Sequence, residues 1–147
     1  MAKLTRNALL AGLIFISFST YAFAANSAPA AGTITPSSGT SNPYQVTTFT
    51  ATYTDPNGYQ DISNARLLIN TSTGGSRCFY GYYNQINNRL YLRDDRNSKW
   101  LGGYAPGSPN SIENSYAKLN CSQTTVQGSG ATLTVTWNIV FKTTFTG

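Results

Sequence analysis

The sequence predicts an antiparallel β-sandwich of about seven short strands. Apolar and polar residues alternate in runs rich in β-branched and aromatic residues, which is typical of strands that bury one face. Glycine, proline, asparagine and serine separate these runs, as expected of turns. No segment after residue 24 has the periodicity of an amphipathic helix. A small barrel is the alternative architecture.

The clearest predicted strand lies in ATLTVTWNIVF, near the C-terminal end of the sequence. Apolar residues there alternate strictly with polar ones, at Leu133, Val135, Trp137, Ile139 and Phe141. Such a run indicates a half-buried strand with one face in the core. The shorter alternations in QVTTFTATYT and ARLLIN predict two further strands.

The middle of the chain predicts a hairpin. In RCFYGYYNQINNRLYLRDD, two β-rich runs flank the polar linker NQINN, which has the length of a hairpin loop. Residues 96–115 are rich in glycine, proline, serine and asparagine, and they predict a long loop that carries Trp100 and Tyr104. YAKLNC predicts a short strand, and TTVQGSGAT predicts a turn.

The first 24 residues predict a secretory signal peptide. Lys3 and Arg6 precede an apolar run at residues 8–18, and the small residues Ala22 and Ala24 follow it. The run is about half the length of the roughly 20 apolar residues that a membrane span needs. We therefore expect cleavage after Ala24 and a mature chain that is periplasmic, cell-surface or extracellular.

The rest of the chain predicts one domain. Residues 25–41 are small, polar and interrupted by proline, so we expect a flexible mature N-terminus with at most a short strand at 32–35. Residues 42–147 have the length of one ordinary domain. No run after the signal is long and apolar enough to predict a membrane span.

Composition restricts the chemistry of the chain. It contains no histidine, which excludes Ser-His-Asp and Cys-His catalysis and histidine-bound zinc. Basic residues outnumber acidic ones, 10 to 5, but they are spread along the chain. The weak cluster from Arg89 to Lys99 contains Asp94 and Asp95, and we interpret it as a solvated hairpin end. A nucleic-acid partner is therefore not expected.

The two cysteines, Cys78 and Cys121, predict an intramolecular disulfide, because we expect the chain to be exported to an oxidising compartment.

The stretch YTDPNGYQDI fits either a turn or a calcium loop. Asp55, Asn57 and Asp61 offer oxygen ligands, but their spacing does not match that of an EF-hand loop. In a turn, Pro56 pre-sets φ, Asn57 and Gly58 tolerate positive φ, and Asp55 accepts amide hydrogen bonds. We therefore favour the turn and keep calcium as the weaker hypothesis.

Several segments together resemble an uncharacterised immunoglobulin-like repeat of bacterial secreted and surface proteins. They are TITPSSGT, FTATYTDPNGYQDISNARLLIN, YNQINNRLYLRDD, Trp100, PGSPNSIENS and SGATLTVTWNIVFKTTFTG, and they cover residues 32–147. The resemblance implies an immunoglobulin-like sandwich outside the cell membrane. It implies no established activity, catalytic residue or cofactor.

These features favour a non-catalytic domain that has a structural role or binds a protein or polysaccharide at the cell surface. A carbohydrate-binding module is the alternative, and a fimbria-like assembly subunit is the third hypothesis. An enzyme is the least favoured class, since no pair of carboxylates is placed to flank one bond. For the carbohydrate alternative, the candidate ligand-binding residues are Tyr82, Tyr83, Asn84, Asn88, Trp100 and Tyr104.

Overall fold

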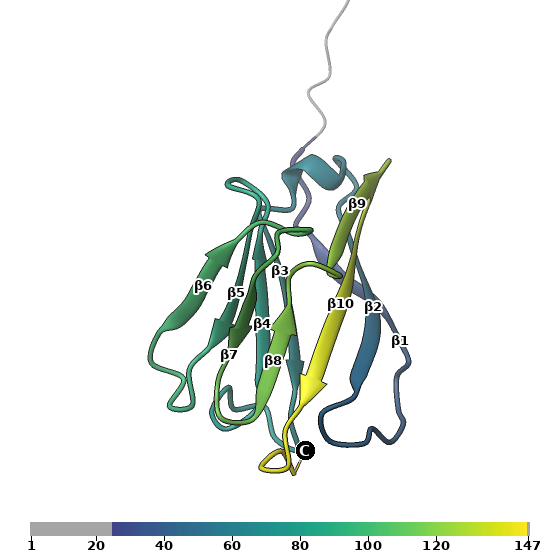
Figure 1. The fold of residues 1–147 in the computed structure, drawn as a ribbon. Helices are drawn as coiled ribbons and strands as arrows, with labels where there is room; N and C mark the ends of the chain where they lie inside the picture. Colours follow the sequence, from purple (N-terminus) through teal and green to yellow (C-terminus); the bar gives the residue numbers. More distant parts are fainter. Residues whose placement is uncertain (1–24, 147) are drawn as a thin grey trace, which may run out of the picture.

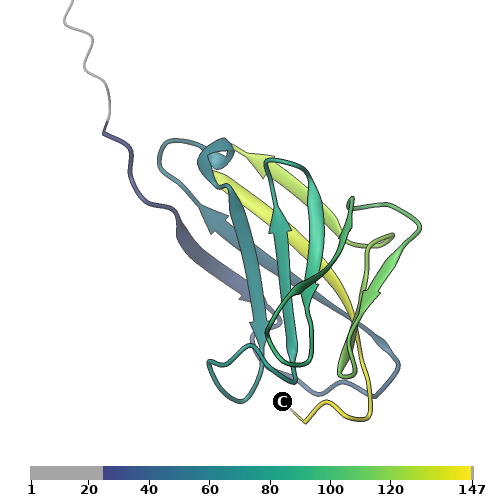
Figure 2. The same cartoon turned by 90° about the vertical axis from the view of Figure 1, so that its left-hand side faces the viewer.

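The computed structural model describes residues 25–146 and consists of two antiparallel sheets packed face to face (Figures 1 and 2). One sheet has the order β1-β2-β10-β8-β7, with β9 also paired to β10, and the other is the meander β3-β4-β5-β6. The strands are β1 (Ala30–Thr35), β2 (Val46–Thr54), β3 (Asn64–Ile69), β4 (Phe79–Asn84), β5 (Arg89–Arg93), β6 (Trp100–Tyr104), β7 (Ser111–Glu113), β8 (Ala117–Asn120), β9 (Thr125–Ser129) and β10 (Thr132–Phe141).

The structure confirms the all-β, antiparallel two-sheet sandwich. The described residues contain ten strands rather than about seven, and their one helical element is a 3-10 turn, η1 (Tyr59–Asp61). No helix in this part of the chain is long and apolar enough to cross a membrane. The signal peptide predicted at residues 1–24 lies outside the described residues.

Three strands arise where the sequence predicted loops or turns. β6 and β7 lie within the predicted loop at residues 96–115, and β9 lies within TTVQGSGAT, the segment predicted to contain a turn. In β6, Gly102 and Gly103 have φ values of +98° and +101°, which side chains other than glycine rarely adopt. This irregularity removes the alternation by which a strand is recognised in a sequence.

The predicted N-terminal strand begins earlier than expected. β1 starts at Ala30 rather than residue 32, and it pairs with β2 at the edge of the six-stranded sheet. Part of the predicted flexible segment, residues 25–41, thus belongs to the sandwich.

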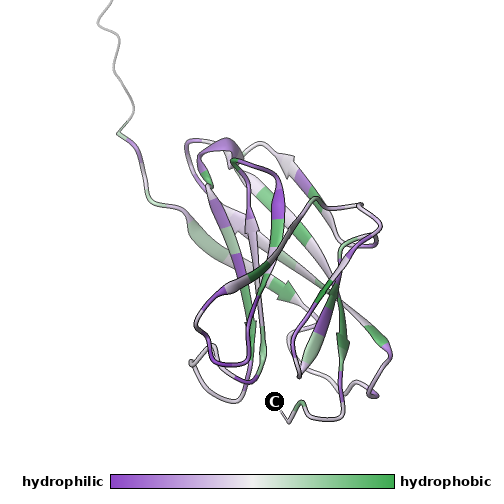
Figure 3. Ribbon diagram, turned by 60° about the vertical axis from the view of Figure 1, so that its left-hand side comes forward, coloured by the Kyte–Doolittle hydropathy of each residue, from purple (hydrophilic) through white to green (hydrophobic). Residues whose placement is uncertain are grey.

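β10 organises the six-stranded sheet. It pairs with β2 from Thr132 to Val140, and on its other side with β9 and then with β8. The five alternating apolar residues predicted for this strand are all buried. Figure 3 shows how hydrophobic and hydrophilic residues alternate along the strands. The prediction for this strand is confirmed.

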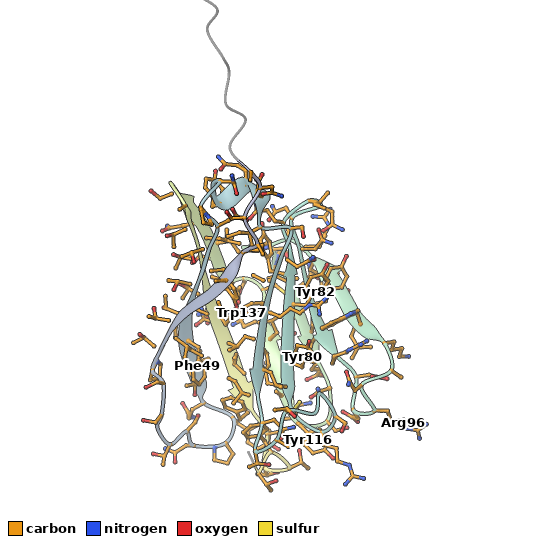
Figure 4. The ribbon with its side chains drawn as sticks, turned by 180° about the vertical axis from the view of Figure 1, so that it is seen from behind. Phe49, Tyr80, Tyr82, Arg96, Tyr116 and Trp137 are labelled. Carbon is orange, nitrogen blue, oxygen red and sulfur yellow. The ribbon has the colours of Figure 1, made fainter. Side chains whose placement is uncertain are left out.

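The core centres on Trp137, which is fully buried between the sheets (Figure 4). Its ring contacts Phe79 of the opposite sheet edge to face, with ring centroids 6.2 Å apart. Gly81 makes room for this contact, since a Cβ there would lie 2.7 Å from the Phe79 ring and 3.0 Å from the Trp137 ring. The absence of a side chain at Gly81 therefore lets the Trp137 ring of one sheet pack against the Phe79 ring of the other.

The predicted disulfide between Cys78 and Cys121 is wrong: both cysteines are buried free thiols. Asn114 Nδ2 donates to the Cys78 carbonyl oxygen over 3.0 Å, and Asn114 Oδ1 accepts from Ala117, where β8 begins. Cys121 follows the other end of this four-residue strand, which is about 13 Å long. A disulfide tolerates Cα atoms up to only about 7 Å apart.

Both thiols should therefore alkylate without a reductant once the protein is denatured, and neither should react in the native state. Burial raises the pKa of Cys121 to about 11 and also raises the pKa of Cys78, so little thiolate forms at neutral pH. Mass spectrometry after iodoacetamide treatment should show two added groups in denaturant. Alkylation that requires prior reduction would contradict the free thiols and support the disulfide between Cys78 and Cys121.

The two tryptophans should contribute very differently to stability. Trp137→Ala should lower the free energy of unfolding by about 3–5 kcal/mol, because it opens a cavity between the sheets. Trp100→Ala, on the outside of the other sheet, should cost about 1 kcal/mol through lost ring contacts. Urea unfolding followed by circular dichroism measures both, and equal losses would contradict the central place of Trp137.

Candidate functional site

The two outer faces of the sandwich differ in chemistry. Strands β1, β2, β9 and β10 contain no charged residue, and their outer face carries cross-strand threonine pairs such as Thr52 with Thr134 and Thr50 with Thr136. Strands β3 to β6 contain three arginines and no acidic residue. The charged residues of the six-stranded sheet are Glu113 on β7 and Lys118 on β8, so the arginines and the clustered aromatic rings belong to the four-stranded sheet.

The outer surface of the four-stranded sheet is named here the arginine–aromatic face. Strand alternation brings its members together, because outward residues of β3, β4 and β5 lie opposite one another in register. In one row, Arg66, Tyr82 and Tyr91 are direct neighbours. The polar, charged and aromatic residues of this face are Asn64, Arg66, Tyr80, Tyr82, Asn84, Arg89, Tyr91, Arg93 and Trp100.

Four aromatic rings form a continuous cluster on this face. Tyr82 stacks on Tyr91, with ring centroids 5.3 Å apart and an interplanar angle of 22°. Its ring also meets Trp100 at 4.9 Å and 45°, and Trp100 meets Tyr80 at 5.2 Å and 63°. Figure 4 shows Tyr80 and Tyr82 along the same strand. The rings contact one another and do not form a coplanar platform.

Two arginines lie over this ring cluster. The guanidinium carbon of Arg93 is 4.4 Å from the centroid of the Trp100 ring, and that of Arg66 is 5.4 Å from the centroid of Tyr82. Such cation–π contacts restrict the position of a guanidinium while leaving N–H groups to donate. Arg93 Nε is buried and has no hydrogen-bond partner among the described residues.

Amide and phenol groups complete the face. Tyr82 donates its hydroxyl hydrogen to Asn64 Oδ1 over 2.6 Å, and Asn84 Nδ2 donates to the Tyr82 oxygen over 2.7 Å. These bonds fix the Tyr82 ring at the centre of the cluster. The remaining hydrogen-bond donors and acceptors of the Asn64 and Asn84 side chains could bind hydroxyl or carboxylate groups of a ligand.

The structure brings together only part of the predicted carbohydrate site. Tyr82, Asn84 and Trp100 lie on the arginine–aromatic face. Tyr83 does not, because it points into the core with 5% of its surface exposed. Its hydroxyl donates to Asn88 Oδ1 over 3.0 Å, which ties Asn88 of the hairpin turn to this buried residue.

Tyr104 also lies apart from the face. It is 41% exposed at the end of β6 and contacts none of the rings of the cluster. The glycine bulge between Trp100 and Tyr104 changes the register of β6 against β5, and this separates the two aromatic residues.

Sequence reasoning missed six residues of the face, namely Asn64, Arg66, Tyr80, Arg89, Tyr91 and Arg93. The signal was present, because Tyr80 precedes Tyr82 by two positions and Tyr91 follows Arg89 by two. Alternation within each strand places such residues on one face. The register between strands, which decides whether the rings and arginines meet, was not available from alternation alone.

The segment around Asp55 has the hydrogen bonds of a turn. Asp55 Oδ1 accepts from the Asn57 amide over 2.8 Å, and the Asp55 carbonyl oxygen accepts from the Gly58 amide over 3.0 Å. Gly58 has a φ of +123°, and Asn57 Oδ1 accepts from the Ser27 amide over 2.7 Å. The structure places Asp61 in η1. Within residues 25–146, no group of three or more His, Cys, Asp or Glu side chains could hold a metal ion.

The carboxylates next to β5 are bound within the protein. Asp94 accepts from the Ser98 hydroxyl and amide over 2.5 and 2.6 Å, and the hydroxyl bond is the main cause that lowers the pKa of Asp94. Asp95 accepts from the Ser115 amide and hydroxyl over 2.9 and 2.6 Å. Neither forms an ion pair with the neighbouring Arg93, since the one salt bridge among the described residues joins Lys142 and Glu113.

A groove of about 630 Å³ opens between the sheets near the connection from β1 to β2. Ile34, Phe49, Phe141 and Phe145 form its apolar wall, and the serine-rich residues 37–41 line it as well. The same apolar side chains pack against the core cluster or belong to it. We interpret the groove as the rim of the core.

Comparison of the chain with protein-family models, with curated proteins and with solved structures gives no match.

Replacing Asp55 should weaken the turn without any effect of calcium. Asp55→Ala removes the acceptor for the Asn57 amide, so the free energy of unfolding should fall by about 1–3 kcal/mol. Thermal unfolding of the parent protein should be the same in calcium and in chelator. A calcium-dependent rise in Tm that Asp55→Ala abolishes would support the metal hypothesis.

Proposed function

We propose that this protein is an exported, non-catalytic, immunoglobulin-like domain that binds a macromolecule at the cell surface or outside the cell. The arginine–aromatic face is its binding surface. The observation that carries the proposal is the cluster of four aromatic rings and three arginines on one outer face, with no acidic residue in its strands.

The contrast between the two outer faces supports this proposal. A sheet needs only small polar or β-branched residues to remain stable on its solvent side, as the threonine pairs of β2 and β10 illustrate. Tyrosine, tryptophan and arginine are the residue types enriched where proteins bind partners. Aromatic side chains also supply a large contact area with little loss of conformational entropy on binding.

The immunoglobulin-like class rests on architecture. Two packed antiparallel sheets and a buried tryptophan between them agree with it. The strand order differs from that of an antibody constant domain, where successive strands change sheets more often. Here β3, β4, β5 and β6 form one uninterrupted meander. This meander produces the broad face that we propose for binding.

Two observations favour binding over catalysis or assembly. Asp94 and Asp95 accept hydrogen bonds from neighbouring serines, and Glu113 pairs with Lys142 over 3.2 Å, so these carboxylates have structural partners. A fimbria-like subunit completes its fold with a partner's strand. The N-terminal segment of this chain instead forms β1, which pairs with β2 of the same chain.

The test is co-sedimentation of the purified protein with isolated cell envelopes and with insoluble polysaccharides. We expect depletion from the supernatant, and at least a fivefold loss of it in the double variant Trp100→Ala, Arg93→Gln. The matched control is Thr50→Ala, Thr134→Ala on the opposite face, which should sediment like the parent. Equal binding by both double variants would refute the proposed surface, and no depletion by any of these materials would refute the binding function.

A further inference from the structure

We propose that the ligand of the arginine–aromatic face is an acidic polysaccharide, whose carboxylate or phosphate groups are bound by Arg66, Arg89 and Arg93. This inference rests on the proposed function and names the class of its ligand. It follows from the charge of the face, from how the arginines are held, and from which ring surfaces remain accessible.

The strands of the face carry three positive charges and no negative one. None of its three arginines forms an ion pair within residues 25–146, where the single salt bridge lies elsewhere. Asp94 and Asp95, which follow β5 directly, accept hydrogen bonds from Ser98 and Ser115. The sequence places these acids within the basic cluster from Arg89 to Lys99, but neither forms an ion pair with Arg93. An anionic ligand would supply the missing counter-charge.

Most N–H groups of the three guanidinium groups make no hydrogen bond within the described part of the chain. The side chains of Arg66 and Arg93 donate no hydrogen bond within the described part of the chain, and Arg89 donates one, to the Asn88 carbonyl oxygen over 3.3 Å. A guanidinium offers five N–H donors in a fork that matches a carboxylate or phosphate with two parallel bonds. Because Arg66 and Arg93 already lie over rings, less conformational entropy is lost when they bind.

The arginines are spaced for an extended ligand. Arg66 lies on β3 and the other two on β5, so they are two strands, or about 10 Å, apart across the sheet. Arg89 and Arg93 are four residues, or about 13 Å, apart along β5. One small anion cannot reach all three. A polymer that repeats its charge can, and each further contact then forms at high effective concentration.

The ring contacts favour a glycan over a single-stranded nucleic acid. Proteins bind single strands by stacking bases on free aromatic faces. Tyr82 lies between Arg66 and Tyr91, and Trp100 is covered by Arg93 and abutted by Tyr80. The groups left for a ligand are guanidinium donors, asparagine amides and phenols. These groups suit the hydroxyl and acidic groups of a charged sugar chain.

The experiment compares two pairs of glycans, each a charged polymer and its uncharged counterpart, with a single-stranded nucleic acid. Binding of the protein to polygalacturonate, to its methyl ester, to dextran sulfate, to dextran and to oligo-dT is measured by affinity electrophoresis or calorimetry. We expect binding to polygalacturonate or dextran sulfate at least tenfold tighter than to the uncharged counterpart, and weaker in high salt. Arg66→Gln and Arg93→Gln should each weaken it about tenfold. Arg96→Gln, which removes the same charge from the β5–β6 turn, should change it less than twofold.

The outcomes separate this inference from the proposed function. Equal affinity for charged and uncharged polymers, lost with Trp100→Ala, would overturn the acidic ligand and keep a carbohydrate-binding face. Tighter binding to oligo-dT than to any glycan would overturn it in favour of nucleic acid. Envelope binding through this face without affinity for any of the five polymers would also overturn it and point to a protein partner. If Arg96→Gln and Arg93→Gln lowered the affinity equally, net charge alone would explain the binding, and the assignment to the arginines of the face would be overturned.

Discussion

The contact of Trp137 with Phe79 above Gly81 is the interaction on which the rest of the sandwich depends. Trp137 belongs to β10, the strand that joins β2 on one side to β8 and β9 on the other. Gly81 belongs to β4, which joins β3 to β5. Because protein interiors are close-packed, the largest buried side chain of one sheet requires a gap in the other. The glycine supplies that gap, and it fixes which residues of β4 point inward and which point outward.

This constraint also determines the composition of the outer surface. With Gly81 inward, Tyr80 and Tyr82 must point to solvent, and the register places Tyr91 and Arg66 on either side of Tyr82. One shift of register would exchange the buried and exposed sets. Leu67, Gly81 and Leu92 form the inner row directly beside the outer row of Arg66, Tyr82 and Tyr91. The register between β3, β4 and β5 therefore determines both which residues enter the core and which residues form the proposed binding face.

The arginine–aromatic face combines groups that stabilise each other. The rings of Tyr82 and Trp100 position the guanidinium groups of Arg66 and Arg93, and those groups cover ring surface that would otherwise meet water. Such a cluster is ordered before any ligand arrives. The opposite sheet carries uncharged threonine pairs on β2 and β10, and its β7 and β8 add only Glu113 and Lys118, so it has no comparable group of arginines over aromatic rings.

The fold class, the inward residues of β10 and the hairpin from β4 to β5 could be predicted from the amino-acid sequence, because these depend on alternation and turn chemistry within short stretches. It indicated Trp100, Tyr82 and Asn84 as surface residues for a ligand, but it also included Tyr83, which alternation with Tyr82 sends inward. Tertiary structure alone decided three things. Pairing with β5 made a strand of β6, despite its glycine bulge, where the local pattern predicted a loop. The length of β8 separates Cys78 from Cys121. The register between strands brings two arginines and four aromatic rings together. Each depends on contacts between residues distant in the chain, which local patterns do not encode.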